Sequence, residues 1–522
     1  MREEGGARVI ASGKGCHLID TDGDRLLDGM GGLWCVNIGY GRPELAEAAA
    51  RQMRELPYYN SFFKTTMPAT VQLAEELAEL APEGLNRVFF SNSGSEANDT
   101  NIRIARTYWQ KRGAPERTVI VSRKLAYHGS TIAAASLTGL ASMHDIAGIP
   151  IPDIVHAPAP FWWAEGGDLS PEEFGLKAAR GVEETILAVG PERVAAFIGE
   201  PVQGAGGVIV PPSTYWPEVQ RICRKYGILL IVDEVICGFG RTGQWFGSQT
   251  LGIAPDIMTV AKGMSSGYLP ISASIVHDRV AEVVFDAPGR FPHGYTYSGH
   301  PVAAAVSREN IAIMKREGIV ERVGSDIGPY FQERLATLLD HELVGEVRGV
   351  GLMGAVELTR DRKGRGPVEP VGSMATPVRN ACFANGLATR AVRDCLVFSP
   401  PLVILRAEVD ELVDLPGQRD EGRVDRGIDR GTCRDSIGRC PERNECREHE
   451  AICSRRRNGV SAGLTATQAA PVLSPDARAW RCAPCRDRPA VSPRRSPHAH
   501  AAPGPSGLRS VRSSRVRAVR LR

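Results

Sequence analysis

The stretch that decides the fold is residues 228–234, Ile-Leu-Leu-Ile-Val-Asp-Glu, together with residues 256–262, Asp-Ile-Met-Thr-Val-Ala-Lys. Each run is short and apolar, and each ends in a charged side chain. Short apolar runs of this kind predict strands that are buried on both faces of a parallel sheet. A carboxylate directly behind such a strand is costly to bury unless it pairs with a cation. The two runs therefore predict a sheet with reactive groups at its strand ends.

The same pattern continues on either side, because residues 85–265 alternate strand candidates with segments of helical apolar period. This alternation predicts an α/β fold with a mostly parallel, doubly wound sheet. Ligands bind such sheets at the carboxyl ends of the strands. The predicted strands are 87–91, 118–122, 194–199, 228–232 and 256–261, and the predicted helices are 71–80, 95–112 and 214–226.

Residues 91–98, Ser-Asn-Ser-Gly-Ser-Glu-Ala-Asn, connect the first predicted strand to a long helix. Ser93 and Glu96 match the S-x-x-E capping box, which places the helix start here. The free N–H groups of the first turn, the Gly94 backbone and the Ser95 hydroxyl form a candidate phosphate site. A simple helix cap explains the same residues, so this motif alone leaves both interpretations open.

Three further strand ends carry candidate groups. Tyr127, in Tyr-His-Gly, could lie against a planar ring or belong to the core. Asp233 follows the fourth strand, and Lys262 follows the fifth, where a buried amine with a lowered pKa makes a good nucleophile; the alternative is a surface lysine. Residues 238–243 match G-x-G-x-x-G, but no helical pattern follows them, so we reject a dinucleotide site.

One cofactor accounts for the whole set. Pyridoxal phosphate needs a lysine for its Schiff base, an acid at its pyridine nitrogen, a phosphate site and a flat group against its ring. Lys262, Asp233, the 93–95 loop and Tyr127 supply these four requirements. We expect no metal site.

With these motifs the sequence resembles the class III aminotransferases of the aspartate-aminotransferase-like fold (fold type I), in particular their ω-amine:pyruvate branch. The resemblance spans residues 5–415. It implies a large cofactor-binding domain at 45–300 and a smaller α+β domain built from 1–44 and 301–415. The motifs that carry it lie at 32–41, 91–98, 127–129, 199–207, 233–243, 261–270 and 293–301.

The resemblance also implies roles for individual residues. Lys262 would hold the cofactor and move the proton, and Asp233 would keep the pyridine nitrogen protonated. Tyr127 and Val235 would enclose the ring, and Gln203 would approach its hydroxyl group. The full implied cofactor set is Ser93, Gly94, Ser95, Tyr127, His128, Gln203, Asp233, Val235, Lys262 and Thr296, the last reaching the phosphate of the neighbouring subunit in a homodimer.

Two residues match substrate positions of the family. Trp34 would form a wall of the pocket, or else is an ordinary core tryptophan. Arg390 would bind the carboxylate of the acceptor through a bidentate contact and swing away for an amine that lacks one; the alternative is a surface arginine.

We therefore expect a cytoplasmic transaminase that moves an amino group from a primary amine or ω-amino acid to pyruvate or a related 2-oxo acid. It would act as a homodimer or as a tetramer, with no membrane or nucleic-acid partner. The alternatives are another reaction on the same scaffold, an aminomutase or a decarboxylating transaminase. From a different class, the alternative is an inactive or nucleic-acid-binding protein that acts through an arginine-rich tail.

Composition separates that tail, residues 416–522, from the rest. The chain has 522 residues and a net charge of +3, but the tail alone carries 23 Arg, no Lys and 11 acidic residues. So little apolar material predicts disorder. A basic arm for nucleic acid and a zinc module around Cys482 and Cys485 are weaker interpretations than a wrong-frame translation, which we favour.

The remaining composition fits an ordinary globular protein, with 43% hydrophobic and 24% charged residues. No apolar run approaches the roughly 18–20 residues of a membrane helix, and no signal peptide is visible. The six cysteines before the tail show no spacing typical of a disulfide framework, which fits the cytoplasm.

Overall fold

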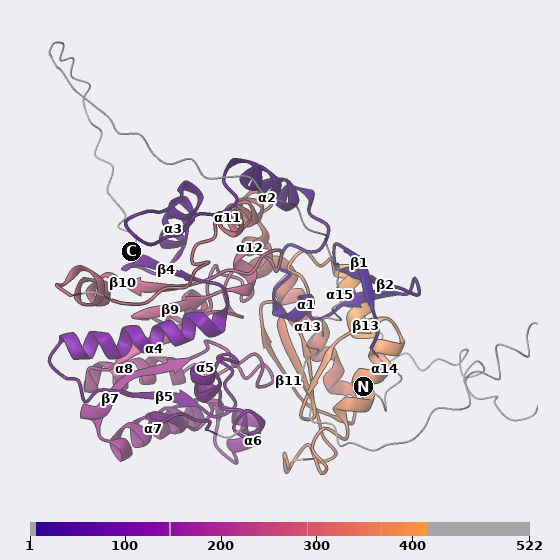
Figure 1. Ribbon diagram of the computed structural model, residues 1–522. Helices are drawn as coiled ribbons and strands as arrows, with labels where there is room; N and C mark the ends of the chain where they lie inside the picture. The colour runs from indigo at the N-terminus through magenta and orange to yellow at the C-terminus, as the bar shows by residue number, and fades with distance from the viewer. Residues whose placement is uncertain (1–6, 146–147, 290, 367, 415–522) are drawn as a thin grey trace, which may run out of the picture. The chain divides into compact units, whose positions relative to one another are not determined.

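A seven-stranded sheet organises the part of the chain that the structure describes, residues 7–145, 148–289, 291–366 and 368–414. In this computed structural model the strand order is β4-β10-β9-β8-β7-β5-β6; Figure 1 labels β4, β10, β9, β7 and β5 of this sheet. The bounds are β4 Leu85–Ser91, β5 Val119–Arg123, β6 Ile154–Ala157, β7 Val194–Gly199, β8 Leu229–Asp233, β9 Ile257–Val260 and β10 Ser272–His277.

The predicted mostly parallel sheet is confirmed. All five predicted strands are present, as β4, β5, β7, β8 and β9. Neighbours β6, β5, β7, β8 and β9 are parallel, whereas β10 runs antiparallel to both β4 and β9. Strands β6 and β10 were not predicted from the sequence.

Helices cover both faces of this sheet, as expected for a doubly wound fold. Alternate residues of β8 face opposite sides: Leu230 and Val232 pack with α7 (Pro171–Val189) and α8 (Tyr215–Tyr226), and Leu229 and Ile231 pack with α4 (Gly94–Lys111). Because both faces are buried, the strand is apolar up to its last residue, Asp233. The predicted helices are confirmed as α3 (Pro68–Leu80), α4 and α8.

The remaining strands form two smaller sheets. One has the order β11-β12-β15-β14, and the other β1-β2-β3-β13. Strand β13 pairs in parallel with β3, so segments near residues 27 and 387 share a sheet. The bounds are β1 Ile10–Lys14, β2 His17–Asp20, β3 Arg25–Asp28, β11 Val344–Val350, β12 Met353–Leu358, β13 Leu387–Ala388, β14 Arg390–Val392 and β15 Cys395–Phe398. The division of the chain at residues 45 and 300 stays a prediction.

The longer of the remaining helices pack against the two smaller sheets, against α3 or against one another. They are α2 (Pro43–Glu55), α11 (Pro301–Arg316), α13 (Gly328–Ala336), α14 (Ala375–Ala384) and α15 (Arg406–Asp414), and the short helices are α1 (Gly31–Trp34), α5 (Ile132–Leu137), α6 (Trp162–Glu165), α9 (Gly247–Leu251), α10 (Asp278–Ala281) and α12 (Ile319–Arg322). None of the helices in the described ranges is long and apolar enough to cross a membrane.

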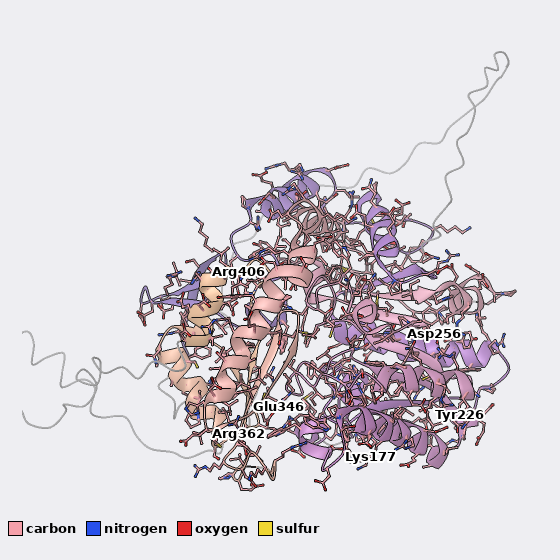
Figure 2. The ribbon with its side chains drawn as sticks, turned by 180° about the vertical axis from the view of Figure 1, so that it is seen from behind. Lys177, Tyr226, Asp256, Glu346, Arg362 and Arg406 are labelled. Carbon is pink, nitrogen blue, oxygen red and sulfur yellow. The ribbon has the colours of Figure 1, made fainter. Side chains whose placement is uncertain are left out.

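The amino-terminal ends of the central strands are joined by Asp256, which Figure 2 labels on the sheet. Its carboxylate accepts a 2.9 Å hydrogen bond from the backbone N–H of Leu230 and also pairs with Arg279. This acid therefore binds β8 to the loop before β9. The expectations for the 416–522 tail lie outside the described residues.

Candidate active site

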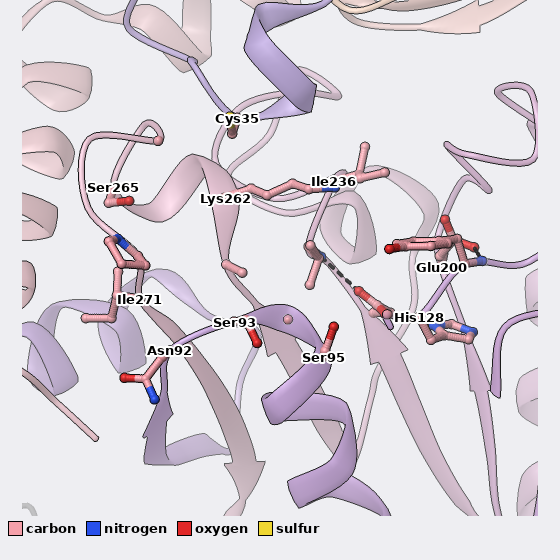
Figure 3. A pocket seen from close by; sticks show the side chains of 18 of the residues that line it. Cys35, Asn92, Ser93, Ser95, His128, Glu200, Ile236, Lys262, Ser265 and Ile271 are labelled. Carbon is pink, nitrogen blue, oxygen red and sulfur yellow. Dashed lines mark hydrogen bonds and ion pairs between the residues drawn. The ribbon is translucent and has the colours of Figure 1, made fainter. Parts of the chain in front are cut away.

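A cavity of about 400 Å³ lies where the parallel strands of the large sheet end. In Figure 3, Lys262 enters it from the side of Cys35 and Ser265, with the start of α4 below and Glu200 and His128 beyond. The structure brings together eight of the predicted cofactor residues in its lining: Ser93, Gly94, Ser95, Tyr127, His128, Asp233, Val235 and Lys262.

The start of α4 forms the floor of the cavity. The Ser93 side chain caps the helix by accepting a hydrogen bond from the Glu96 backbone N–H at 3.2 Å. The reciprocal half of the predicted capping box is absent, because Glu96 instead accepts from the Asn92 backbone N–H at 2.7 Å. A Cβ atom on Gly94 would lie 2.9 Å from Val235 Cγ2, so only glycine allows this approach of the helix to the cavity wall.

Asp233 ends β8 and is 3% exposed. Its Oδ2 lies 2.8 Å from His128 Nδ1 and accepts from Asn98 Nδ2 at 2.8 Å. Its Oδ1 accepts from the Val235 backbone N–H at 3.1 Å. These three hydrogen-bonding partners compensate the burial of the carboxylate and fix its direction.

Lys262 follows β9 in a turn with a left-handed backbone, φ = +44°. Non-glycine residues rarely adopt this conformation, and such strain is found where surrounding contacts impose it. Burial lowers the pKa of the Lys262 amine; the charges of Asp233, Cys35 and Glu200 oppose this shift, and that of Arg390 reinforces it. A buried amine with a lowered pKa can act both as a nucleophile and as a base.

Glu200 is a lining residue that the sequence predictions missed. Its carboxylate accepts from the backbone N–H groups of Tyr127 and Gly204, each at 3.0 Å. Burial raises its pKa, while His128 and Arg123 act in the opposite direction. The sequence does carry a signal for this residue, because Glu200 directly follows the apolar strand β7 just as Asp233 ends the apolar strand β8.

A further part of the cavity lining is apolar and was also not predicted. It comes from Ile236 and from the 269–271 segment, Leu-Pro-Ile, with Cys35 beside Lys262. Cys35 is half-buried, whereas the other cysteines in the described ranges are buried. Apolar loop residues carry no pattern that distinguishes a pocket wall from core, so no signal could have found them.

Four predicted residues do not line this cavity. Gln203 is buried and donates through Nε2 to the Lys124 carbonyl at 3.0 Å. Trp34 is 2% exposed and packs with Ile236. Thr296 is exposed, and Arg390 is half-buried and close enough to affect the pKa of Lys262. Within the described ranges, no group of three His, Cys, Asp or Glu side chains could hold a metal ion.

The site suits pyridoxal phosphate. Helix geometry gives the N–H groups of Gly94 and Ser95, at the start of α4, no acceptor within the helix, and both residues line the cavity beside Val235. The fixed carboxylate of Asp233 and the Lys262 amine line the same cavity.

Comparison with known proteins gives the family. The model of the aminotransferase class-III family matches residues 2–415. The putrescine–pyruvate aminotransferase of Pseudomonas aeruginosa is 54% identical over 412 residues, which cover 79% of this chain and 90% of that protein. The diaminobutyrate–2-oxoglutarate transaminase of Halomonas elongata is 45% identical over 415 residues, covering 78% and 88%.

Solved structures agree. A structure titled as a transaminase with L-Ala is 46% identical, with a TM-score of 0.77, covering 78% of this chain and 97% of that one. The thermostable (S)-enantioselective ω-transaminase of Thermomicrobium roseum is 46% identical with a TM-score of 0.76, covering 79% and 92%. The chain belongs to the class III aminotransferases, which are pyridoxal-phosphate-dependent enzymes.

Proposed function

We propose that this enzyme transfers an amino group from an aliphatic diamine of the putrescine type to pyruvate. Amine transfer to pyruvate or a related 2-oxo acid is the activity of the class to which the chain belongs. The observation that carries the choice of diamine and acceptor is the 54% identity to a putrescine–pyruvate aminotransferase over 412 residues. The apolar side chains of Ile236, Leu269 and Ile271 in the cavity lining suit an aliphatic chain.

Asp233 and Lys262 carry the chemistry in this proposal. Bound pyridoxal phosphate supplies an electron-withdrawing ring that makes the substrate C–H bond acidic. Asp233 would support that ring by presenting its carboxylate to the pyridine nitrogen. Lys262 Nζ holds the cofactor at first, and as a free amine it then takes and returns the substrate proton, because its lowered pKa favours the neutral base.

The other lining residues bind and orient. The start of α4 and the Ser95 hydroxyl would hold the phosphate, and Tyr127 and Val235 would enclose the ring. Glu200 supports Tyr127 by accepting its backbone N–H. We assign Gln203 to the ring hydroxyl, and Trp34 to the pocket wall through its packing against Ile236.

Arg390 is proposed to bind the carboxylate of pyruvate. Its charge acts on the pKa of Lys262, so the guanidinium lies near the reacting amine. A diamine has no carboxylate, so Arg390 would move away when the donor binds. This movement lets one pocket accept both substrates in turn, as a ping-pong reaction requires.

We further propose a cytoplasmic homodimer with shared active sites. Phe63 is 90% exposed, Tyr297 58% and Tyr59 50%, and a groove of about 700 Å³ lies beside them, between the 61–66 and 291–298 segments. Exposed aromatic side chains beside a groove are typical of protein interfaces. Thr296 lies in the same region and is assigned to the phosphate of the neighbouring subunit.

A panel of amine donors with pyruvate as acceptor tests the proposal. Alanine formation is measured with putrescine, β-alanine, taurine and an aryl amine, and putrescine should give the highest kcat/KM. A clear preference for an ω-amino acid or an aryl amine would contradict the assignment of the donor. The Lys262→Ala variant is the control and should form no alanine above background.

A further inference from the structure

A chain of buried polar side chains leads away from the active site into the protein, and none of its outer members has a role so far. Asn98 and Asn101 lie on α4, and Thr259 lies on β9. All three are 0% exposed. Because unpaired polar groups are costly at such depth, their hydrogen bonds define which way each side chain faces.

The chain has a single direction. Asn101 Nδ2 donates to Thr259 Oγ1 at 2.6 Å, and the Thr259 hydroxyl donates to Asn98 Oδ1 at 2.7 Å. A hydroxyl has only one hydrogen, and the bond from Asn101 directs that hydrogen to Asn98. The amide oxygen of Asn98 therefore faces Thr259, and its nitrogen faces the active site.

The Asn98 nitrogen meets Asp233 at the other end. Nδ2 donates both to Asp233 Oδ2 and to the His128 carbonyl, each at 2.8 Å. His128 Nδ1 takes a second position on the same Oδ2. Among the described residues, Oδ1 receives only the Val235 backbone N–H, at 3.1 Å, so it keeps an acceptor position free.

We propose that Asn98 and Thr259 are positioning residues that hold the Asp233 carboxylate in the orientation that receives the ring nitrogen of the cofactor. The inference rests on the proposed function, in which Asp233 pairs with that nitrogen. Asn98 occupies Oδ2 and so leaves Oδ1 for the ring, and Thr259 keeps Asn98 from turning its amide oxygen toward the carboxylate. Asn101 supports the arrangement from the far end.

The test compares two ligands that differ only at the ring nitrogen. These are pyridoxal phosphate and its deaza analogue, in which a C–H group replaces that nitrogen. Their dissociation constants from the apoenzyme are measured by equilibrium dialysis. Asn98→Ala should weaken pyridoxal phosphate about tenfold, as expected for a lost hydrogen bond to a charged group, and leave the analogue within about twofold.

Thr259 gives a second and milder comparison. Thr259→Val removes the hydroxyl at nearly constant shape and should weaken pyridoxal phosphate about threefold, and Thr259→Ser should restore it. Because this pair separates the hydroxyl from the packing, it decides the question even if Asn98→Ala fails to fold. Thr359→Val is the matched control, since Thr359 is also buried, directly after β12, and its hydroxyl accepts from the Asp361 N–H at 3.0 Å.

A purely structural role would weaken both ligands equally, or neither, and either result overturns the inference. The inference is supported if Asn98→Ala and Thr259→Val lose the preference for pyridoxal phosphate over the deaza analogue while Thr359→Val keeps it. A wild-type enzyme that bound pyridoxal phosphate no better than the deaza analogue would instead contradict the proposed role of Asp233 itself.

Discussion

At the residue scale, buried carboxylates at the ends of β7 and β8 shape the site. Glu234 follows Asp233 and is fully buried, accepting from the backbone N–H groups of Gly247 and Ser248 at the start of α9. Burial raises its pKa from 4.5 to about 7, against these hydrogen bonds. The group thus binds a proton more tightly in the folded state than in the unfolded chain.

This shift predicts how stability depends on pH. Between pH 4.5 and about 7 the folded state keeps a proton that the unfolded chain has lost, so stability falls as pH rises. Over this pH range the free energy of unfolding should fall by about 3 kcal/mol through Glu234. Glu234→Gln should remove this decline, measured by urea unfolding at a series of pH values. An identical pH slope in the variant and the wild type would contradict the prediction.

Arg390 provides a prediction about the acceptor. Arg390→Leu should raise the KM for pyruvate about tenfold or more, because a bidentate contact to a carboxylate is lost, while the KM for the diamine changes little. Steady-state kinetics with each substrate varied in turn measures both. Arg393→Leu is the control: Arg393 lies at the next turn with its guanidinium 5.4 Å from the Phe161 ring, and its loss should leave the pyruvate KM unchanged. Equal effects of the two variants would argue against a carboxylate site at Arg390.

The sequence was most informative where a charged residue stands at the end of an apolar strand pattern. Asp233 and Lys262 were predicted in this way, and the structure places both in one cavity. Glu200 carries the same signal, directly after β7, but the 199–207 motif did not single it out as a site residue. Asn98 could not be found, because a polar residue within a helix gives no indication that it reaches across to another strand end.

At the element scale, the start of α4 combines a structural cap with the proposed phosphate site. The Ser93 hydroxyl accepts a hydrogen bond from the Glu96 backbone N–H, and a side chain without an acceptor at position 93 leaves that N–H without this partner. Ser93→Ala should lower the free energy of unfolding of the apoprotein by about 1 kcal/mol, and Ser93→Asp should retain most of it. Urea unfolding without cofactor measures this effect, and an alanine variant as stable as the wild type would contradict it.

Two strands and one helix show where local pattern fails. Strand β10 reads Ser-Ala-Ser-Ile-Val-His, and its polar serines hide the apolar pattern of a buried strand. Ser272 and Ser274 can nevertheless be buried, because their hydroxyls donate to the carbonyls of Ser93 and Ala97. Strand β6 has only four residues. Helix α7 does carry a complete capping box at Ser170 and Glu173, a signal that could have predicted it.

At the scale of the whole molecule, the proposed dimer depends on exposed aromatic residues. Phe63→Glu places a charge in the groove beside the 291–298 segment and should shift the protein toward monomer, as measured by light scattering. Because Thr296 is assigned to the partner's phosphate, the monomer should also lose pyridoxal phosphate more readily. Leu187→Glu on α7, 54% exposed and outside that groove, is the control. A dimeric Phe63→Glu enzyme would place the interface elsewhere.

Lys262 is the residue that carries the cofactor in the proposed site, and every other assigned role depends on it. Borohydride reduction fixes pyridoxal phosphate to the amine that holds it, and peptide mass mapping then locates the label. We expect the phosphopyridoxyl group on the peptide that contains Lys262 and nowhere else, with no label in Lys262→Ala. A label on another lysine, or none on the wild-type enzyme, would contradict the site.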